Sequence, residues 1–318
     1  MADNNKKSGV YAAIGNFDGF HRAHQALAAA LCREAVGDGM PAYIIGFEPH
    51  PLTVIKGSGP LLLSDQGDKE RMMRDFFGVD EVVKLSFDQE MAKMTAADFV
   101  EDILHKKFAV KHVFVGFNFT FGSHGSGDAQ ELSRLCAERG IRTTVIPACE
   151  CDYGVISSSL IRQYLAEGKL GGANEMLGYW YKFSGITEQG NQKGRSWGFA
   201  TANIAVSAER QLPPYGVYAA RVEMDGKTYD AIVNLGTKPT VAAGNRVLLE
   251  AHLLDIPDED LYNRKMEVCL GEFVRAEKKF ADITELKEAV YKNIAEAGEL
   301  LSCLPSDAHL IKNIYKTC

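Results

Sequence analysis

Short apolar runs alternate with helix-like segments through the first half of the chain. The runs are typical of strands buried in a parallel sheet, and they cover residues 10–14, 41–47, 81–87, 111–115 and 142–147. Between them, residues 25–32, 68–77 and 95–108 have apolar positions at helical spacing, and Thr95 is placed to cap the last of these helices. Strands that alternate with helices predict an α/β domain with a doubly wound parallel sheet.

The pattern changes between Gly171 and Gly178 to short strands separated by turns. Asp225-Gly226 stands between the apolar runs 217–224 and 227–235, which predicts a hairpin. Further strands are expected over 247–255 and 265–273. These features predict a small antiparallel β-barrel or sandwich. We therefore expect two domains, 1–178 and 179–318, with Gly178 as the hinge.

A closing helix is expected over residues 285–301. Thr284 precedes it as a candidate cap, and Leu286, Val290 and Ile294 would face inward. The length of 318 residues also suits two domains rather than one core.

Charge and cysteine usage narrow the class of protein. The net charge of −7, without a long basic run, favours small-molecule partners over a nucleic acid. Seven cysteines form no disulfide framework, and Cys149-Glu-Cys151 lacks the second pair of a zinc site. No signal peptide or apolar membrane span of about 18 residues is present. We expect a cytoplasmic protein that does not bind membranes.

The segment G-N-F-D-G-F-H-R-A-H, residues 15–24, lies directly between the first strand and the first helix. Gly15 and Gly19 allow close backbone approach or positive φ, and the helix N-terminus attracts anions. The segment therefore predicts a phosphate site that contains His21 and His24. The alternative is that both are ordinary surface or helix-capping histidines.

Three further segments of the first domain carry polar groups near strand or helix ends. His50 lies between two prolines after the second strand. It is either a binding residue or an incidental part of a rigid turn. Phe117, Phe119 and Phe121 alternate along the chain, which is typical of a buried strand. The alternative is that this segment is a ligand-binding loop that contains Asn118. Ser158, Ser159 and Arg162 open a helix and offer hydroxyl and guanidinium groups to an anion, with a simple serine cap as the alternative.

The second domain has two candidate sites. A glycine-bounded loop, with Gly194 and Gly198, leads into a strand that carries Thr201 and Asn203. By itself the loop sequence indicates only a turn. Glu250 interrupts the apolar run 247–254, where a carboxylate is either on a solvated face or held in a cleft as a base.

The first-domain segments resemble the flavin-type nucleotidyltransferases, relatives of the HxGH enzymes that act on the α-phosphate of ATP. Residues 15–24 are similar to the signature GxFDGxHxGH, with Ala23 in place of a glycine, and residues 157–162 to ISSTxIR, with Ser159 in place of threonine. Glu48 to Pro51 and the segment around Asn118 are similar to FEPHP and VGxDFxFG, where Asn118 replaces aspartate.

The second domain resembles the riboflavin kinase module. Its pattern GxxxGFPTANI…LPxxGVYxxxV…NxGxxPT…ExHLLD matches residues 194–204, 212–222, 234–240 and 250–255, with Ala200 in place of proline. Both resemblances in this order identify the chain as a member of the prokaryotic-type FAD synthases.

The family resemblance implies two reactions, riboflavin to FMN and FMN to FAD, with riboflavin, FMN and ATP as partners and Mg²⁺ bound with ATP. It implies that Glu250 is the kinase base, that Thr201 and Asn203 contact metal and phosphate, and that Asn118 and His50 line the flavin side. It implies that His21 and His24 are catalytic residues of the adenylyl transfer. The remaining ATP and phosphate positions it implies are Gly15, Asn16, Phe17, Asp18, Gly19, Ser158, Ser159, Arg162, Gly194 and Gly198. The alternatives are a chain with one active module, for which Ala23 or Ala200 would be the cause, and a flavin sensor without turnover.

Overall fold

The computed structural model describes residues 9–188, 201–240, 244–254, 256, 261–278 and 280–304. Contacts divide these into two compact units. The first contains 9–60 and 66–156, and the second contains 61–65 and the described residues from Ser157 onward. The division by packing thus falls between Ile156 and Ser157, earlier than the domain division that the sequence predicts at residue 178.

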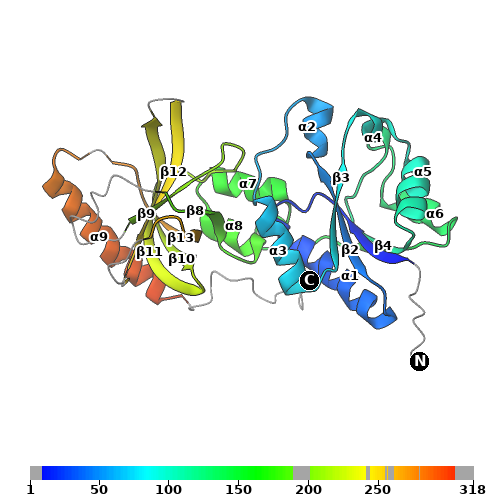
Figure 1. Cartoon of the computed structure of the whole chain (residues 1–318), viewed down its shortest axis with the longest axis horizontal. Coiled ribbons are helices and arrows are strands. Elements are labelled where there is room, and N and C mark those ends of the chain that lie inside the picture. The colour runs from blue at the N-terminus through cyan, green and yellow to red at the C-terminus, as the bar shows by residue number, and fades with distance from the viewer. Residues whose placement is uncertain are drawn as a thin grey trace. The chain divides into compact units, whose positions relative to one another are not determined.

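The first unit is built on a five-stranded parallel sheet in the order β3-β2-β1-β4-β5. Its strands are β1 (Val10–Ile14), β2 (Ala42–Glu48), β3 (Glu81–Ser86), β4 (Val110–Gly116) and β5 (Arg142–Ile146). Figure 1 shows helices on both faces of this sheet. This confirms the predicted doubly wound fold, because parallel neighbours need helical crossovers.

The helices of the first unit follow the strands in alternation. The main ones are α1 (Arg22–Asp38), α3 (Gln66–Phe77), α5 (Ala96–Asp98), η2 (Phe99–Lys107) and α6 (Ala129–Ala137), and the shorter elements are η1 (Asp18–Phe20), α2 (Pro51–Lys56), α4 (Gln89–Lys93), η3 (Ser123–Gly125), β6 (Glu150–Cys151) and β7 (Gly154–Val155). Thr95 accepts a hydrogen bond from Asp98 N at 3.1 Å, which confirms it as the predicted cap of α5.

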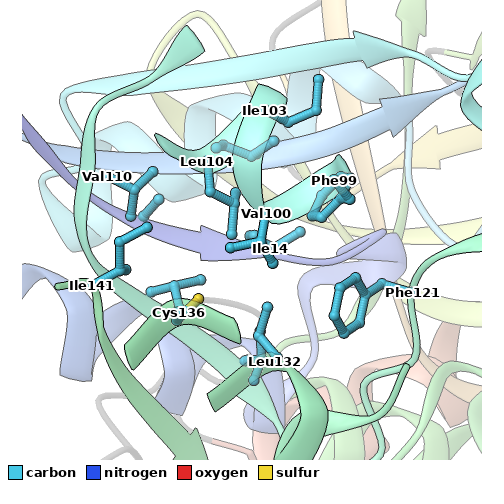
Figure 2. Close-up of a cluster of buried hydrophobic side chains, with 14 of the residues drawn as sticks. Ile14, Phe99, Val100, Ile103, Leu104, Val110, Phe121, Leu132, Cys136 and Ile141 are labelled. Carbon is cyan, nitrogen blue, oxygen red and sulfur yellow. The ribbon is translucent and has the colours of Figure 1, made fainter. Parts of the chain in front are cut away.

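One face of the parallel sheet packs on η2 and α6. Ala12 and Ile14 of β1 contribute to a buried cluster together with Val100 and Leu104 of η2 and Leu132 of α6 (Figure 2). Successive side chains of a strand point to opposite faces. The intervening residues of β1 therefore face the other side of the sheet, where α1 packs on β1, β2 and β4. The core on both faces fixes β1, and with it the turn that follows Ile14.

The second unit is a curled six-stranded antiparallel sheet in the order β8-β13-β10-β11-β12-β9. Its strands are β8 (Tyr181–Ile186), β9 (Thr201–Ala205), β10 (Gly216–Met224), β11 (Lys227–Thr240), β12 (Gly244–Leu253) and β13 (Lys265–Ala276). The first and last strands approach each other, because Glu188 N donates to Asn203 O at 2.8 Å. The predicted barrel-like antiparallel fold is confirmed.

The predicted hairpin joins β10 to β11. Asp225 and Gly226 have φ values of 51° and 73°. Positive φ at both central residues is the requirement of a type I′ turn.

The predicted cap of the final helix, α9 (Ile283–Ser302), is wrong. Asp282 rather than Thr284 occupies the cap position: its backbone is extended, and its carboxylate accepts from Glu285 N at 2.9 Å. Thr284 lies inside the first turn because the helix starts earlier than the apolar spacing indicates. Ile294 packs as predicted against the cluster that includes Ala297 and Leu301.

Two helices precede the antiparallel sheet, α7 (Ser158–Ala166) and α8 (Leu170–Leu177). The prediction that short strands begin near Gly171 is therefore wrong, and Gly178 is the αL residue that ends α8. Asn174 fixes α8 to the sheet: its Nδ2 donates to Leu270 O at 3.0 Å, and its Oδ1 accepts from Tyr181 N at 2.7 Å. These contacts explain why α8 packs with the second unit.

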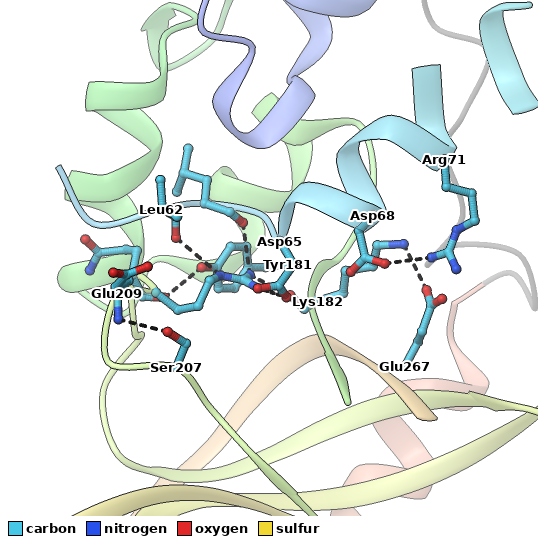
Figure 3. A network of polar contacts seen from close by, with 12 residues as sticks. Leu62, Asp65, Asp68, Arg71, Tyr181, Lys182, Ser207, Glu209 and Glu267 are labelled. Carbon is cyan, nitrogen blue, oxygen red and sulfur yellow. Dashed lines mark hydrogen bonds and ion pairs between the residues drawn. The ribbon is translucent and has the colours of Figure 1, made fainter. Parts of the chain in front are cut away.

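Residues 61–65, which precede α3 in the chain, also pack in the second unit. Leu62 N donates to Glu209 O at 2.7 Å, and Leu62 O accepts from Gln211 N at 2.9 Å. Arg210, which is 3% exposed, pairs with Asp65. Figure 3 shows Leu62 and Asp65 in this network beside Glu209 and Ser207. The segment is thus held by backbone pairing and by a buried guanidinium.

Candidate functional site

The turn between β1 and α1 has an unusual backbone. Phe17, which is buried, has φ 52° and ψ 26°, and Gly19 has φ 74°. Gly15 lies against the Phe17 ring, since a Cβ at this position would be in van der Waals contact with it at 3.4 Å. Left-handed backbone at a non-glycine residue costs free energy and persists where the surrounding structure fixes it. Gln25 helps to fix the turn by donating from Nε2 to Phe20 O at 2.8 Å.

His21 and His24 lie against each other at the end of this turn. Their ring centroids are 3.7 Å apart with an interplanar angle of 17°, and the Phe17 ring is 5.2 Å from that of His24. His21 precedes α1 at the cap position but makes no capping hydrogen bond with its side chain. The capping alternative therefore fails for His21. Nδ1 of His24 is buried and has no hydrogen-bond partner among the described residues.

The environment of His24 disfavours its charged form. Burial lowers its pKa well below the usual 6.5, and the positive charges of His21 and Lys69 add to this effect. The imidazole is therefore neutral at pH 7. A neutral ring offers one N–H donor and one acceptor to a ligand, but no positive charge.

Lys69 of α3 reaches the same turn, and the sequence analysis missed it. Its Nζ donates to Asn16 O at 3.3 Å. Burial lowers its pKa, which the carboxylates of Asp18, Glu70 and Glu48 counteract. In the sequence Lys69 belongs to a charged amphipathic helix, where a lysine usually faces water. Only the packing of α3 against η1 brings it to the turn.

A pocket lies beside the turn in the first unit. Asn16 and Phe17 of the turn line it together with Gly46 and Glu48 of β2 and with Lys69. Gly46 leaves space there, since a Cβ at this position would lie 3.6 Å from Gly15 O. The turn, β2 and α3 therefore enclose a small concave site in which backbone and charged groups meet.

His50 begins α2 as its cap residue. Its Nδ1 accepts a hydrogen bond from Leu52 N at 3.2 Å, and Pro51 is the first residue of the helix. The sequence predicts a rigid turn here, and the structure has a short helix. The capping bond gives His50 a structural role. Its flavin contact stays a prediction.

Asn118 is exposed in the turn that follows β4. Phe119 N donates to Gly116 O at 3.0 Å, so the strand ends before the phenylalanines, and Phe117 is 48% exposed. The alternative of a continuous strand core is therefore wrong, although Phe121 is buried. Because β1 and β4 are parallel neighbours, the turns after both leave the same edge of the sheet.

Ser158, Ser159 and Arg162 lie on α7 in the second compact unit. The cap of α7 is Ser157, whose hydroxyl accepts from Leu160 N at 3.2 Å. Ser158 is partly buried, Ser159 is exposed, and Arg162 donates from Nε to Leu61 O at 2.6 Å. Their convergence with the histidine turn on one phosphate group stays a prediction.

A row of three polar residues crosses the antiparallel sheet. Glu250 of β12 lies directly opposite Asn203 of β9 on one side and Asn234 of β11 on the other. Residues directly opposite in an antiparallel pair point to the same face. The register therefore places one carboxylate between two amides. Asn203 is 3% exposed, and Glu250 is partly buried.

The row continues onto the face that carries α9. Asn234 is paired with Val217 of β10, which packs in the cluster with Ala297 and Leu301 of α9. The helix packs mainly on β10, β11 and β13. The polar row thus lies beside the helix, toward β12 and β9. Thr201 and His252, which are paired in the next row on the same face, adjoin it.

The residues of this row fit a magnesium ion that is bound with a nucleotide. Among the described residues no three His, Cys, Asp or Glu side chains are grouped to hold a metal by themselves. Mg²⁺ prefers oxygen ligands and usually takes one or two from the protein and the rest from phosphates and water. The Thr201 hydroxyl, the Asn203 amide and the Glu250 carboxylate are such donors. Gly194 and Gly198 lie outside the described residues.

Two family models match the chain. The FAD synthetase family matches residues 3–160, and the riboflavin kinase family matches residues 177–301. The bifunctional riboflavin kinase/FMN adenylyltransferase of Escherichia coli K12 is 38% identical over 297 residues, which are 92% of this chain and 93% of the relative. The protein of the same name from Pseudomonas fluorescens is 35% identical over 295 residues, again 92% and 93%.

A solved structure is similar over nearly the whole chain. It is a crystal structure from Streptococcus pneumoniae that is named a macrolide-efflux protein, with a TM-score of 0.82, 27% identity and coverage of 93% of this chain and 96% of that one. In the part of this chain that the structure describes, no helix has both the length and the apolar character needed to span a membrane.

Proposed function

We propose how the residues above carry out two reactions, from the premise that this chain belongs to the family of bifunctional riboflavin kinase/FMN adenylyltransferases. The chain phosphorylates riboflavin to FMN with ATP and then adenylylates FMN to FAD with release of pyrophosphate. The row Asn203-Glu250-Asn234 is the observation that carries the assignment of the kinase reaction to the second unit. The enzyme works in the cytoplasm, which the free cysteines among its described residues support.

In the kinase reaction the terminal ribityl hydroxyl of riboflavin attacks the γ-phosphorus of ATP. The new bond joins this oxygen to phosphorus, and the bond between the γ-phosphorus and the β-phosphate oxygen breaks, so that ADP leaves. The Glu250 carboxylate accepts the hydroxyl proton. Asn203 and Asn234, on either side of it, hold the carboxylate and the reacting groups in register.

Thr201 and Asn203 are the residues assigned to the ATP phosphates and their metal. Mg²⁺, when bound with ATP, neutralises negative charge on the phosphates. Thr201 is the first residue of β9, so the sheet fixes its position relative to Glu250. Gly194 and Gly198, which precede Thr201 in the chain, are assigned by the family resemblance to the same phosphates.

In the adenylyl transfer a phosphate oxygen of FMN attacks the α-phosphorus of ATP, and the bond to the β-phosphate oxygen breaks. This step needs no proton transfer and no enzyme nucleophile. A neutral His24 suits it, because the ring donates a hydrogen bond to a phosphate oxygen without having to lose a proton. His21 holds the ring of His24 by stacking.

Further groups of the adenylyl-transfer site are assigned by family resemblance. The backbone of residues 15–19 approaches the nucleotide, and the hydroxyls of Ser158 and Ser159 and the guanidinium of Arg162 bind its phosphates. Asn118, at the edge of the sheet to which the β1 turn also leads, lines the flavin side together with His50.

The products formed from riboflavin, ATP and Mg²⁺ test the proposed function. FAD is the expected final product, and chromatography resolves it from FMN and riboflavin. FMN without FAD would show that only the kinase reaction is active. Bound riboflavin that stays unaltered would indicate a flavin sensor without turnover.

Replacement of Glu250 tests its role as the base. Glu250→Gln keeps the size of the side chain but removes its capacity to accept a proton, so we expect the kinase kcat to fall by about 10²- to 10⁴-fold. Riboflavin binding, measured by the quenching of its fluorescence, should stay within about 2-fold of the wild type. Wild-type turnover in this variant would contradict the assignment.

A further inference from the structure

We propose that Lys69 is a phosphate-binding residue of the adenylyl-transfer site, where its ammonium group contacts a phosphate of ATP or of FMN beside His24. This inference rests on the proposed function and adds a residue to it from α3, a helix that contains none of the residues assigned above.

The position of Lys69 gives the first argument. Its Nζ lies 3.3 Å from the carbonyl oxygen of Asn16, in the turn between Gly15 and Phe17. An ammonium group has three N–H donors. One is directed at the backbone of the turn, which leaves two for a ligand, and Lys69 lines the pocket beside the turn.

The charge of Lys69 gives the second argument. Lys84 lines the same pocket and pairs with Glu70 at 2.7 Å, whereas no carboxylate of the described residues forms an ion pair with Lys69. Asp18, Glu70 and Glu48 act on it only from a longer range. A partly buried cation without an ion-pair partner is costly. A phosphate group, for which lysine is a common point-charge ligand, supplies such a partner.

The state of His24 gives the third argument. Its imidazole is neutral at pH 7, and the charge of Lys69 is one of the causes. The transfer of an adenylyl group concentrates negative charge on phosphate oxygens, which fixed positive groups stabilise. The phosphate is therefore bound by two different groups: the neutral imidazole of His24 donates a hydrogen bond, and Lys69 of α3 supplies the positive charge.

The alternative role is purely structural, since the bond to Asn16 also ties α3 to the turn. The two roles differ in what they change. A tether affects folding stability and alters the binding of every ligand alike. A phosphate ligand affects the KM of the substrate whose phosphate it contacts, or kcat when it contacts the transferred group.

Steady-state adenylylation kinetics of Lys69→Gln, Lys69→Arg and Lys111→Gln test the inference, with ATP and FMN varied separately. For Lys69→Gln we expect kcat/KM to fall by about 100-fold, the loss typical of one charge-stabilising donor. Lys69→Arg keeps the charge and should recover at least about a tenth of the wild-type value. Lys111→Gln removes the same charge from an exposed lysine near the start of β4, outside this pocket, and should stay within about 3-fold.

The pattern of losses identifies the phosphate. A rise in the KM of ATP alone assigns Lys69 to the nucleotide, and a rise in that of FMN alone assigns it to the flavin phosphate. Either supports the inference. Wild-type kinetics in Lys69→Gln, or equal losses in Lys69→Gln and Lys111→Gln, would overturn it.

Two controls separate the failure of this inference from other failures. The kinase reaction of Lys69→Gln, which uses the second unit, should match the wild type, and its loss would indicate misfolding and overturn a specific role. If the wild type makes no FAD from FMN, the proposed function itself fails. If the wild type makes FAD, and Lys69→Gln makes it with the kcat and KM of the wild type, only the role of Lys69 fails.

Discussion

His21 and His24 show how neighbours determine the chemistry of a residue type. The spacing of the two histidines was visible in the sequence, but their stacking at 3.7 Å and the neutral state of His24 follow from burial and from nearby positive charge. A neutral imidazole is a hydrogen-bond donor to phosphate rather than a counter-ion. If this turn is the adenylyl-transfer site that we propose, its positive charge has to come from other residues.

The titration of His24 is a direct prediction. Since burial opposes its protonation, its ring signals in an NMR titration should have a midpoint well below pH 6.5. The folded protein then binds fewer protons than the unfolded chain below about pH 6.5, so the free energy of unfolding should decrease as the pH falls through this range. His24→Asn identifies the signals, and a midpoint at or above 6.5 would contradict the buried, neutral ring.

Glu250 and Lys69 differ in how far the sequence could identify them. A carboxylate inside an apolar strand is conspicuous, and alternation along β12 indicates its face. Its partners Asn203 and Asn234 come from two other strands, β9 and β11, and only the register places them opposite it. Lys69 has no local signal, because a lysine in a charged helix is ordinary.

At the scale of elements, strands and long helices followed from the hydrophobic pattern, while helix ends did not. α2 and α8 were missed because helices of six and eight residues span only about two turns and leave little periodicity to detect. The start of α9 was misplaced because two polar residues, Asp282 and Thr284, are both good caps, and the choice depends on which one is extended in the folded chain.

The cap of α9 gives a test at this scale. Asp282→Ala removes the acceptor for Glu285 N and should lower the free energy of unfolding by about 1 kcal/mol. Thr284→Ala is the matched control and should change it by less than about 0.5 kcal/mol, because Thr284 lies within the helix. Urea denaturation followed by circular dichroism measures both. A larger effect of Thr284→Ala would show that the helix begins where the sequence suggested.

At the scale of the whole molecule, each compact unit has its own core. The clusters around Ile14 and around Val217 contain residues of one unit each. Residues 61–65 nevertheless pack in the second unit, where Arg210 donates to Leu63 O. Residues 157–177 pack there too, and Asn174 of this segment binds Leu270 O and Tyr181 N. The two functions should therefore be separable by point substitutions that leave both folds intact.

A mixing experiment tests this separation. Glu250→Gln should be unable to make FMN but able to convert added FMN to FAD, and His24→Asn should make FMN but little FAD. Because FMN is a small molecule that can leave one protein and enter another, a mixture of the two variants should form FAD from riboflavin after a lag. A mixture that accumulates FMN without FAD would contradict independent sites that exchange FMN.

The sequence alone determined the two fold classes, the hairpin at Asp225-Gly226 and the segments that carry the chemistry. These depend on hydrophobic period and on local turn geometry, which neighbouring residues specify. The tertiary structure decided which side chains meet: Lys69 at Asn16, Asn203 and Asn234 on either side of Glu250, and Arg210 on residues 61–65. Such contacts join segments far apart in the chain, and packing and strand register, rather than local pattern, bring them together.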